Sequence, residues 1–257
     1  MRIATFNANS VRLRTDHLLD WMAEHDPDVV CIQEIKCEDD KFPVEEFAEI
    51  GYSSLVYGQK ARHGVAMLYR GVMRDPQRGF PNPAMVDDAR LQAAEIDGVR
   101  IINTYVPNGT AVGGDKWTYK MQWLEEFSRY LQGELRRYDK VIWLGDINIA
   151  RQPLDVYDSG RLLGKVGHHP AEFERLDAIL EHGLADMFRK FNAEGGYYSF
   201  WEFVDIRAFG ANRGWRIDHI YANPGMAELC TACWIDRSLR EQERPSDHTI
   251  VAADFAV

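Results

Sequence analysis

The run Val141-Ile-Trp-Leu-Gly-Asp-Ile-Asn148 joins a short apolar stretch to polar residues at its end. Four consecutive apolar residues closed by a glycine are typical of a buried β-strand. Side chains two apart in a strand point to the same face, so Asp146 and Asn148 are expected to face one cavity where the strand ends. The run therefore predicts a buried sheet with a polar site at the tip of a strand.

Two other apolar runs end in the same manner, Ile3-Ala-Thr-Phe-Asn7 and Val29-Val-Cys-Ile-Gln-Glu34. Further β-rich runs recur along the chain, and the full set is 2–7, 28–34, 64–69, 91–96, 99–106, 140–146, 197–203, 216–222, 229–235 and 250–255. Helical periodicity is confined to segments near 18–26, 121–135 and 170–183. Several strands follow one another directly, which favours sheet packed on sheet with helices outside over a doubly wound sheet or an eight-fold barrel.

Length and composition describe an ordinary globular protein. The chain has 257 residues, 46% hydrophobic and 27% charged, and no linker or low-complexity tract divides it, so we expect one domain over residues 1–257. Forty acidic and thirty basic residues give a net charge of −10, which argues against a general basic surface for nucleic acid. There is no 18-residue apolar run and no signal peptide pattern, so a cytoplasmic protein that does not enter membranes is expected.

The four cysteines do not form the pattern of a disulfide scaffold. Cys230 and Cys233 spell C-x-x-C, but they lie in a predicted strand where residues three apart point to opposite faces, and no second pair completes a zinc site. Buried thiols in a reducing compartment are the simpler interpretation.

Asp218 and His248 are a second candidate pair. Asp218 lies in an otherwise apolar run, and a carboxylate in such a place usually has a partner. If the two meet, Asp218 orients the imidazole and favours its protonated form, which can hold a developing negative charge. A purely structural hydrogen bond is equally compatible with the spacing.

Amide side chains add neutral donors near the same strand ends, at Asn7, Asn9 and Asn108 of the run Tyr105-Val-Pro-Asn108. Oxygen ligands without a cysteine or histidine cluster favour Mg²⁺, with Mn²⁺ as the alternative. Magnesium is commonly held by one or two carboxylates together with substrate phosphates, so phosphoester chemistry is the natural reaction class.

Taken together, the motifs resemble the exonuclease III type of apurinic/apyrimidinic (AP) endonuclease, within the DNase I-like endonuclease/exonuclease/phosphatase superfamily. The resemblance spans the whole chain and rests on Asn7, Gln33-Glu34, Tyr105-Val-Pro-Asn-Gly109, Gly145-Asp-x-Asn148, Asn212-Arg-Gly-Trp-Arg-Ile-Asp218 and Ser246-Asp-His248. It implies an α/β (α+β) four-layer sandwich of two packed, mostly antiparallel sheets flanked by helices.

The resemblance also implies roles for the polar residues. Glu34, with Asn7, Asn9 and Asp247 nearby, would hold the metal, to which Asp146, Asn148 and His248 are also assigned. Asp146 would position or deprotonate the attacking water, with Asn148 beside it. His248, oriented by Asp218, would bind a phosphate oxygen, and Tyr105 with Asn108 would do likewise or support the leaving group.

Aromatic and basic side chains are the remaining candidates for substrate binding. Phe200, Trp201 and Trp215 resemble a pocket for a deoxyribose that lacks its base, although core packing is the alternative and is expected for part of Trp201. Local cations would contact the DNA backbone; the candidates are Arg12, Arg14, Lys36, Lys60, Arg62, Lys116, Arg207, Arg213 and Arg216.

The expected function is that of a monomeric Mg²⁺-dependent DNA repair phosphodiesterase. It would cut duplex DNA 5′ to abasic sites, with 3′-to-5′ exonuclease and 3′-phosphatase activities on blocked 3′ ends. One alternative is a superfamily phosphoesterase acting on phospholipid or inositol phosphate. The other is a DNA-binding relative without catalysis, although such a protein has no need of a carboxylate cluster that repels phosphate.

Overall fold

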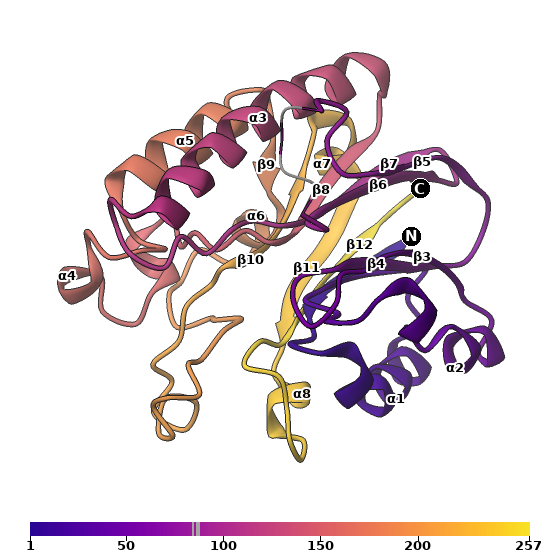
Figure 1. Cartoon of the computed structure of the whole chain (residues 1–257), viewed down its shortest axis with the longest axis horizontal. Helices are drawn as coiled ribbons and strands as arrows, with labels where there is room; N and C mark the ends of the chain where they lie inside the picture. Colours follow the sequence, from indigo (N-terminus) through magenta and orange to yellow (C-terminus); the bar gives the residue numbers. More distant parts are fainter. Residues whose placement is uncertain (84, 86–87) are drawn as a thin grey trace.

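Two six-stranded sheets pack face to face in the computed structural model, which describes residues 1–83, 85 and 88–257. Helices cover the outer face of each sheet, so the layers run helix, sheet, sheet, helix (Figure 1). Each sheet has one parallel pair of strands and is otherwise antiparallel. The predicted fold class, a four-layer sandwich of mostly antiparallel sheets, is confirmed.

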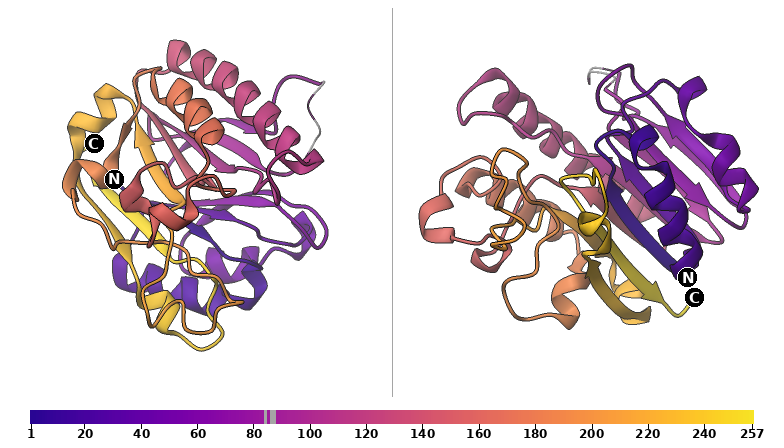
Figure 2. Two further views of the ribbon diagram at one scale, coloured as in Figure 1. Left: turned by 90° about the vertical axis from the view of Figure 1, so that its left-hand side faces the viewer. Right: turned by 90° about the horizontal axis from the view of Figure 1, so that it is seen from below.

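The first sheet has the strand order β11-β12-β1-β2-β4-β3. Its strands are β1 (Arg2–Asn7), β2 (Val29–Gln33), β3 (Ser53–Tyr57), β4 (Val65–Tyr69), β11 (Cys230–Asp236) and β12 (Ile250–Phe255). The parallel pair is β1 and β2. Because β12 lies between β11 and β1, the two ends of the chain are neighbours, as the two views of Figure 2 show.

The second sheet has the strand order β5-β6-β7-β8-β10-β9. Its strands are β5 (Met73–Arg78), β6 (Leu91–Ile96), β7 (Val99–Tyr105), β8 (Val141–Asp146), β9 (Ala185–Asp186) and β10 (Asp218–Ala222). The parallel pair is β7 and β8. Each sheet therefore carries a central parallel pair whose strands end on the same side.

The helices lie outside the sheets or in the connections. They are α1 (Thr15–His25), α2 (Val44–Glu49), α3 (Asp115–Arg137), α4 (Ser159–Leu162), α5 (Pro170–Leu180), α6 (Met187–Phe191), α7 (Pro224–Leu229) and α8 (Ser238–Glu241), with 3₁₀ turns η1 (Val11–Leu13), η2 (Asp39–Lys41) and η3 (Pro153–Asp155). The three helices predicted from periodicity are α1, α3 and α5. None of the helices in the described part of the chain is both long and apolar enough to cross a bilayer.

Three apolar layers hold the sandwich together. The layer between the sheets includes Ile3, Val29 and Ile142, all fully buried. A second layer joins the first sheet to α1 and α2, and a third, rich in aromatic residues such as Trp123, joins the second sheet to α3 and α5. Burying one such side chain stabilises the fold by about 1.5–3 kcal/mol, so these layers fix how the strand ends of the two sheets face each other.

The strand predicted over residues 197–203 is wrong. In this segment only Phe200 forms β-bridges, to Trp215 and His248, and the surrounding residues are loop. Its aromatic residues therefore contact other parts of the protein without belonging to a sheet. Strands β3, β5 and β9 were not predicted; β5 is a largely exposed, polar edge strand and β9 has two residues.

The two cysteines of the C-x-x-C motif lie on the same face of β11. A bulge between Cys230 and Ala232 shifts the register, so that Cys230 is paired with Phe255 and Cys233 with Ala253, two residues apart. The expectation that they point to opposite faces is therefore wrong, because it ignored the extra residue of a bulge. Both thiols are free and buried in the layer between the sheets, as the buried-thiol interpretation predicted.

Candidate active site

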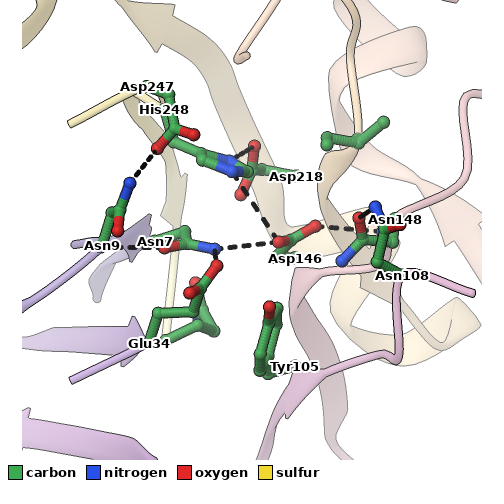
Figure 3. Close-up of polar contacts among 12 residues, drawn as sticks. Asn7, Asn9, Glu34, Tyr105, Asn108, Asp146, Asn148, Asp218, Asp247 and His248 are labelled. Carbon is green, nitrogen blue, oxygen red and sulfur yellow. Dashed lines mark hydrogen bonds and ion pairs between the residues drawn. The ribbon is translucent and has the colours of Figure 1, made fainter. Parts of the chain in front are cut away.

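The polar strand ends of both sheets meet at one rim of the sandwich. Asn7 ends β1, Glu34 follows β2, Tyr105 ends β7 and Asp146 ends β8, so both parallel pairs deliver side chains to the same place. The Asn7 amide joins the sheets by donating 2.9 Å hydrogen bonds to Glu34 Oε1 and to Asp146 Oδ2 (Figure 3). The prediction that these ends gather at one rim agrees with this arrangement.

Asp146, Asp218 and His248 form a buried acid, imidazole, acid arrangement. Asp146 and Asp218 are directly opposite each other on β8 and β10, where like charges are unfavourable unless something compensates them. His248 lies between the two carboxylates, with Nδ1 2.8 Å from Asp218 Oδ2 and Nε2 3.8 Å from Asp146 Oδ2. The three residues are at most 4% exposed, so the imidazole is the nearby group that offsets both charges.

This arrangement shifts the pKa values of both titrating partners. Burial alone would lower the pKa of His248, but the charges of Asp218 and Asp146 outweigh it and raise the pKa to about 10. Burial raises the pKa of Asp146 to about 7; His248 opposes that rise and Asp218 adds to it. At neutral pH His248 is therefore a protonated donor, and Asp146 can exchange a proton.

Glu34 is the centre of a second polar group on the side of the first sheet. Its carboxylate accepts from Asn7 and pairs with Lys36 Nζ at 2.9 Å. Burial would raise the pKa of Glu34, but the Asn7 hydrogen bond and the Lys36 charge together lower it, so the carboxylate is ionised. Asn9 continues the group by donating 2.9 Å to Asp247 Oδ1.

The donor set fits a hard divalent cation. Glu34, Asp146 and Asp247 bring carboxylates to one rim. The Asn7 amide lies between Glu34 and Asp146, where its nitrogen donates to both while its oxygen accepts from the backbone N–H of Asn9. Within the described residues, the converging acidic and histidine ligand atoms that lie within 4.8 Å of one another belong to Asp146, Asp218 and His248. His248 is held protonated, and a histidine binds a metal only through an unprotonated nitrogen, so the carboxylate oxygens fit the ion better than the imidazole.

A wall of neutral donors borders the carboxylates. Asn108 Nδ2 donates to Asn148 Oδ1 at 3.0 Å, and Asn148 Nδ2 donates to the carbonyl of Val106 at 3.0 Å. Strand β8 ends at Asp146, so Asn148 lies just beyond it. Asp146 and Asn148 nevertheless line the same cavity. Burial, followed by the charges of Glu34 and Asp146, raises the pKa of Tyr105 well above its usual value, so its phenol stays neutral.

The close approach of β8 to β7 requires a glycine at position 145, where the motif begins. Gly145 has φ +139°, and a Cβ at this position would lie 2.0 Å from the carbonyl oxygen of Thr104. Only glycine therefore lets β8 approach β7 closely enough to place Asp146 beside Tyr105.

The site opens into a cavity of about 280 Å³ with one polar and one apolar side. The polar side is formed by the carboxylates, the imidazole and the amide wall described above. The apolar side is formed by Phe200, Trp215, Ile217 and Val166, and Gly167 also lines the cavity. Trp201 does not line the cavity. It is fully buried and packs edge-on against Phe209, because the loop that carries it turns back on itself.

Four of the lining residues were not predicted: Glu202, Val166, Gly167 and Ile217. Val166 and Gly167 belong to a loop for which the sequence has no periodic signal, and Glu202 lies in the segment wrongly predicted as a strand. Ile217 could have been proposed from its place next to Asp218 in the motif.

The cations proposed for DNA contact divide into exposed and buried groups. Arg12, Lys60, Arg62, Lys116 and Arg207 are exposed and available. Arg213 is partly exposed and pairs with Asp205. Arg14 and Arg216 are buried, Arg14 on the carbonyls of Asn9 and Pro245, and Arg216 on Asp155 and Asp186. These last two are structural, so the expectation that they contact DNA is wrong.

Comparisons with known proteins agree with this geometry. The model of the endonuclease/exonuclease/phosphatase family matches residues 4–248. Exodeoxyribonuclease III of Haemophilus influenzae is 32% identical over 266 residues, covering 99% of this chain and 100% of that protein. A 3′ phosphatase from Neisseria, NExo with the substitution D146N, bound to a product DNA hairpin, superimposes with a TM-score of 0.96 at 35% identity and full coverage of both chains. An AP endonuclease from Archaeoglobus fulgidus gives 0.95 at 37% identity, also with full coverage of both.

Proposed function

The chain belongs to the endonuclease/exonuclease/phosphatase family, and from this membership we propose that it is a DNA repair nuclease that hydrolyses phosphodiesters of duplex DNA at abasic sites and at blocked 3′ ends. The observation that carries the proposal is the cavity itself. It has ionisable carboxylates and a protonated imidazole on one side and an aromatic wall on the other. The first side suits a phosphate, and the second suits a flipped sugar without its base.

The reaction follows from the positions of the groups. Asp146 accepts a proton from the attacking water, since its pKa of about 7 suits a general base at neutral pH. His248, held by Asp218, donates to a non-bridging phosphate oxygen and offsets the charge that develops there. Tyr105 and Asn108 donate from the opposite wall.

Magnesium is the proposed metal, held chiefly by Glu34 with Asp146 and the amide of Asn7. Asn9, Asp247 and Asn148 complete its surroundings in the proposal. When bound, the ion supplies Lewis-acid stabilisation of the departing oxygen.

The proposal also covers the oligomeric state of the protein and its place in the cell. The enzyme is proposed to be a monomer, because the carboxylates, the imidazole and the aromatic wall of a single chain are sufficient to form the cavity. The free, buried thiols suit the cytoplasm.

A duplex with one abasic site, an intact duplex and a duplex with a 3′-phosphate test the function. With Mg²⁺ we expect incision on the 5′ side of the abasic site, leaving a 3′-hydroxyl that a polymerase extends, and removal of the 3′-phosphate. EDTA should abolish both reactions, and Mn²⁺ should restore them. A protein that binds the abasic duplex but cuts none of these substrates would be the non-catalytic relative, and one that hydrolyses only inositol phosphates would be the lipid-directed alternative.

A further inference from the structure

Lys120 lies completely buried beneath the active site, although the reaction does not use it. It belongs to α3, and its ammonium group touches three other segments of the chain. Nζ donates to the carbonyl of Asn148 at 2.9 Å and to the carbonyl of Asn108 at 3.2 Å, and it pairs with Glu172. All three donors of the ammonium are therefore used.

The two carbonyls belong to the residues that form the amide wall of the cavity. Asn108 and Asn148 are 40 residues apart in sequence, and their side chains are joined by one hydrogen bond. Asn148 has φ +55°, in the left-handed region, which must be imposed by surrounding contacts. A donor that holds both backbones from below fixes the position of both side chains above.

The third contact of the Lys120 ammonium connects the amide wall to helix α5. Glu172 lies in the first turn of α5, where its other oxygen accepts from the backbone N–H of His169 at 3.2 Å. The loop just before this point contains Gly167, whose carbonyl accepts from Ala150 at 2.7 Å. Lys120 thus links the two loops of the amide wall to the first turn of α5, which follows the loop that contains Gly167.

Charge balance alone does not account for this geometry. A buried ammonium needs one carboxylate to compensate it, and Glu172 supplies that. The two further bonds are directed to the loops of the active site instead of to nearby helix groups. We propose that Lys120 is a positioning residue, which holds the Asn108 and Asn148 amides in the geometry required for phosphoester cleavage.

The chain offers a matched control in a second buried ion pair that involves the same helix. Arg100 of β7 pairs with Glu134 near the other end of α3, and this ion pair is also buried. Arg100 also contacts the carbonyl of Asp75 and the side chain of Gln77 on β5 and lies over the ring of Tyr138, and none of these groups lines the cavity. Replacing either Lys120 or Arg100 leaves a buried carboxylate without its cation, so both replacements should lower stability. Only Lys120 contacts the amide wall.

The experiment compares Lys120→Met with Arg100→Met, and adds Lys120→Met/Glu172→Gln, which removes the uncompensated carboxylate. Melting temperature, KM and the single-turnover rate are measured on abasic and 3′-phosphate duplexes with Mg²⁺. In parallel, the side-chain amide signals of Asn108 and Asn148 are followed by NMR without DNA. The inference rests on the proposed function, so wild-type cleavage is measured first, and the NMR readout does not depend on it.

We expect both single variants to melt at lower temperature. Only Lys120→Met should lose cleavage, on the order of 10²-fold in the single-turnover rate with little change in KM, which is what a misplacement of about 1 Å costs. The double variant should recover stability without recovering the rate, and the two amide signals should shift in both Lys120 variants but not in Arg100→Met. An unchanged rate or unchanged amide signals in the double variant, or an equal loss of rate in Arg100→Met, would overturn the proposal. Wild-type protein that cuts no DNA would refute the proposed function, while the amide signals would still test the positioning.

Discussion

Two aspartates that face each other across neighbouring strands set the chemistry of the site. Asp146 and Asp218 are register partners, and the imidazole of His248 between them makes their proximity tolerable. The arrangement divides the work between the two carboxylates. Asp218 is tied to the imidazole, whereas Asp146 faces the cavity with a raised pKa and is free to take a proton.

Asp146→Asn should therefore lose more than the ~10²-fold that one general base contributes, while abasic duplex still binds. Single-turnover cleavage and equilibrium binding, measured on the same protein, separate the two effects. A normal cleavage rate in this variant would remove Asp146 from its assigned role.

Glu34→Gln tests the metal assignment. The substitution keeps the size of the side chain and removes the ionised carboxylate that Asn7 and Lys36 hold in place. We expect a higher Mg²⁺ concentration for half-maximal activity and a turnover lower by orders of magnitude, with an unchanged melting temperature. A wild-type Mg²⁺ titration in this variant contradicts the assignment.

Two tryptophans predicted to form the same pocket, Trp201 and Trp215, have different surroundings, and this gives a matched test of selectivity. Trp215→Ala widens the cavity, so the ratio of cleavage on abasic to intact duplex should fall while metal binding is retained. Trp201→Ala should instead cost about 3–5 kcal/mol of stability, the usual loss for a large buried aromatic, and leave that ratio unchanged. If a well-folded Trp215→Ala protein keeps the ratio, Trp215 is not part of the pocket.

Among the larger elements, the loop after Phe200 presents apolar side chains directly to solvent. Val204 is 97% and Ile206 94% exposed, and Glu202, two residues before Val204, lines the cavity. Figure 1 shows this loop projecting beside the segment around α8, and Arg240 of α8 packs on Phe203. Apolar side chains exposed beside a nucleic-acid site are suited to wedge between base steps of a bent duplex.

Val204→Ser/Ile206→Ser should therefore weaken binding of abasic duplex about tenfold, equivalent to ~1.4 kcal/mol, with stability unchanged. Val72→Ser is the control, since Val72 is 60% exposed on the turn between β4 and β5, at the far ends of those strands from the site. Equal affinity of the loop variant and the control for the duplex would show that the loop does not contact DNA.

Among helices, strands and loops, the sequence predicted those elements that have their own periodicity. The apolar runs predicted the strands of both parallel pairs and the polar residues at their ends, because these features are local. The polar edge strand β5, the bulge in β11 and the loop over residues 197–203 were missed or misassigned, because tertiary pairing decides them. Phe200 and Trp215 of the apolar wall were predicted, but Val166, Ile217 and Lys120 were missed, since their places depend on segments brought together by packing.

For the whole molecule, the second sheet is anchored to its loops by one fully buried cation. Arg216 binds Asp155 at 2.8 Å and Asp186 at 2.8 Å. Burial opposes ionisation of both carboxyls, but the Arg216 charge outweighs it and lowers the pKa of each. Carboxyls with lowered pKa values stabilise the fold above pH ~4, the value in the unfolded chain, and this contribution is lost as the pH falls through the folded-state values.

Arg216→Met should accordingly reduce the free energy of unfolding at pH 7 by about 3–5 kcal/mol. It should also flatten the further loss of stability below pH 4, because the variant lacks the largest charge that lowers the pKa values of the two carboxyls. Arg151→Met is the control, since its pair with Asp177 is partly exposed and worth about 0–1 kcal/mol. Urea unfolding between pH 7 and pH 3 measures both variants; an acid response in Arg216→Met as steep as in the wild type speaks against the assignment.

The place of β12 between β11 and β1 has a consequence for how the protein is made in the cell. The strand that closes the first sheet, and His248 just before it, leave the ribosome after all the other groups of the site. A growing chain therefore carries its carboxylates without the imidazole that compensates them, and β1 still lacks one neighbour. We expect a chain that ends before His248 to cut no DNA, because it lacks both the imidazole and the strand that pairs with β1.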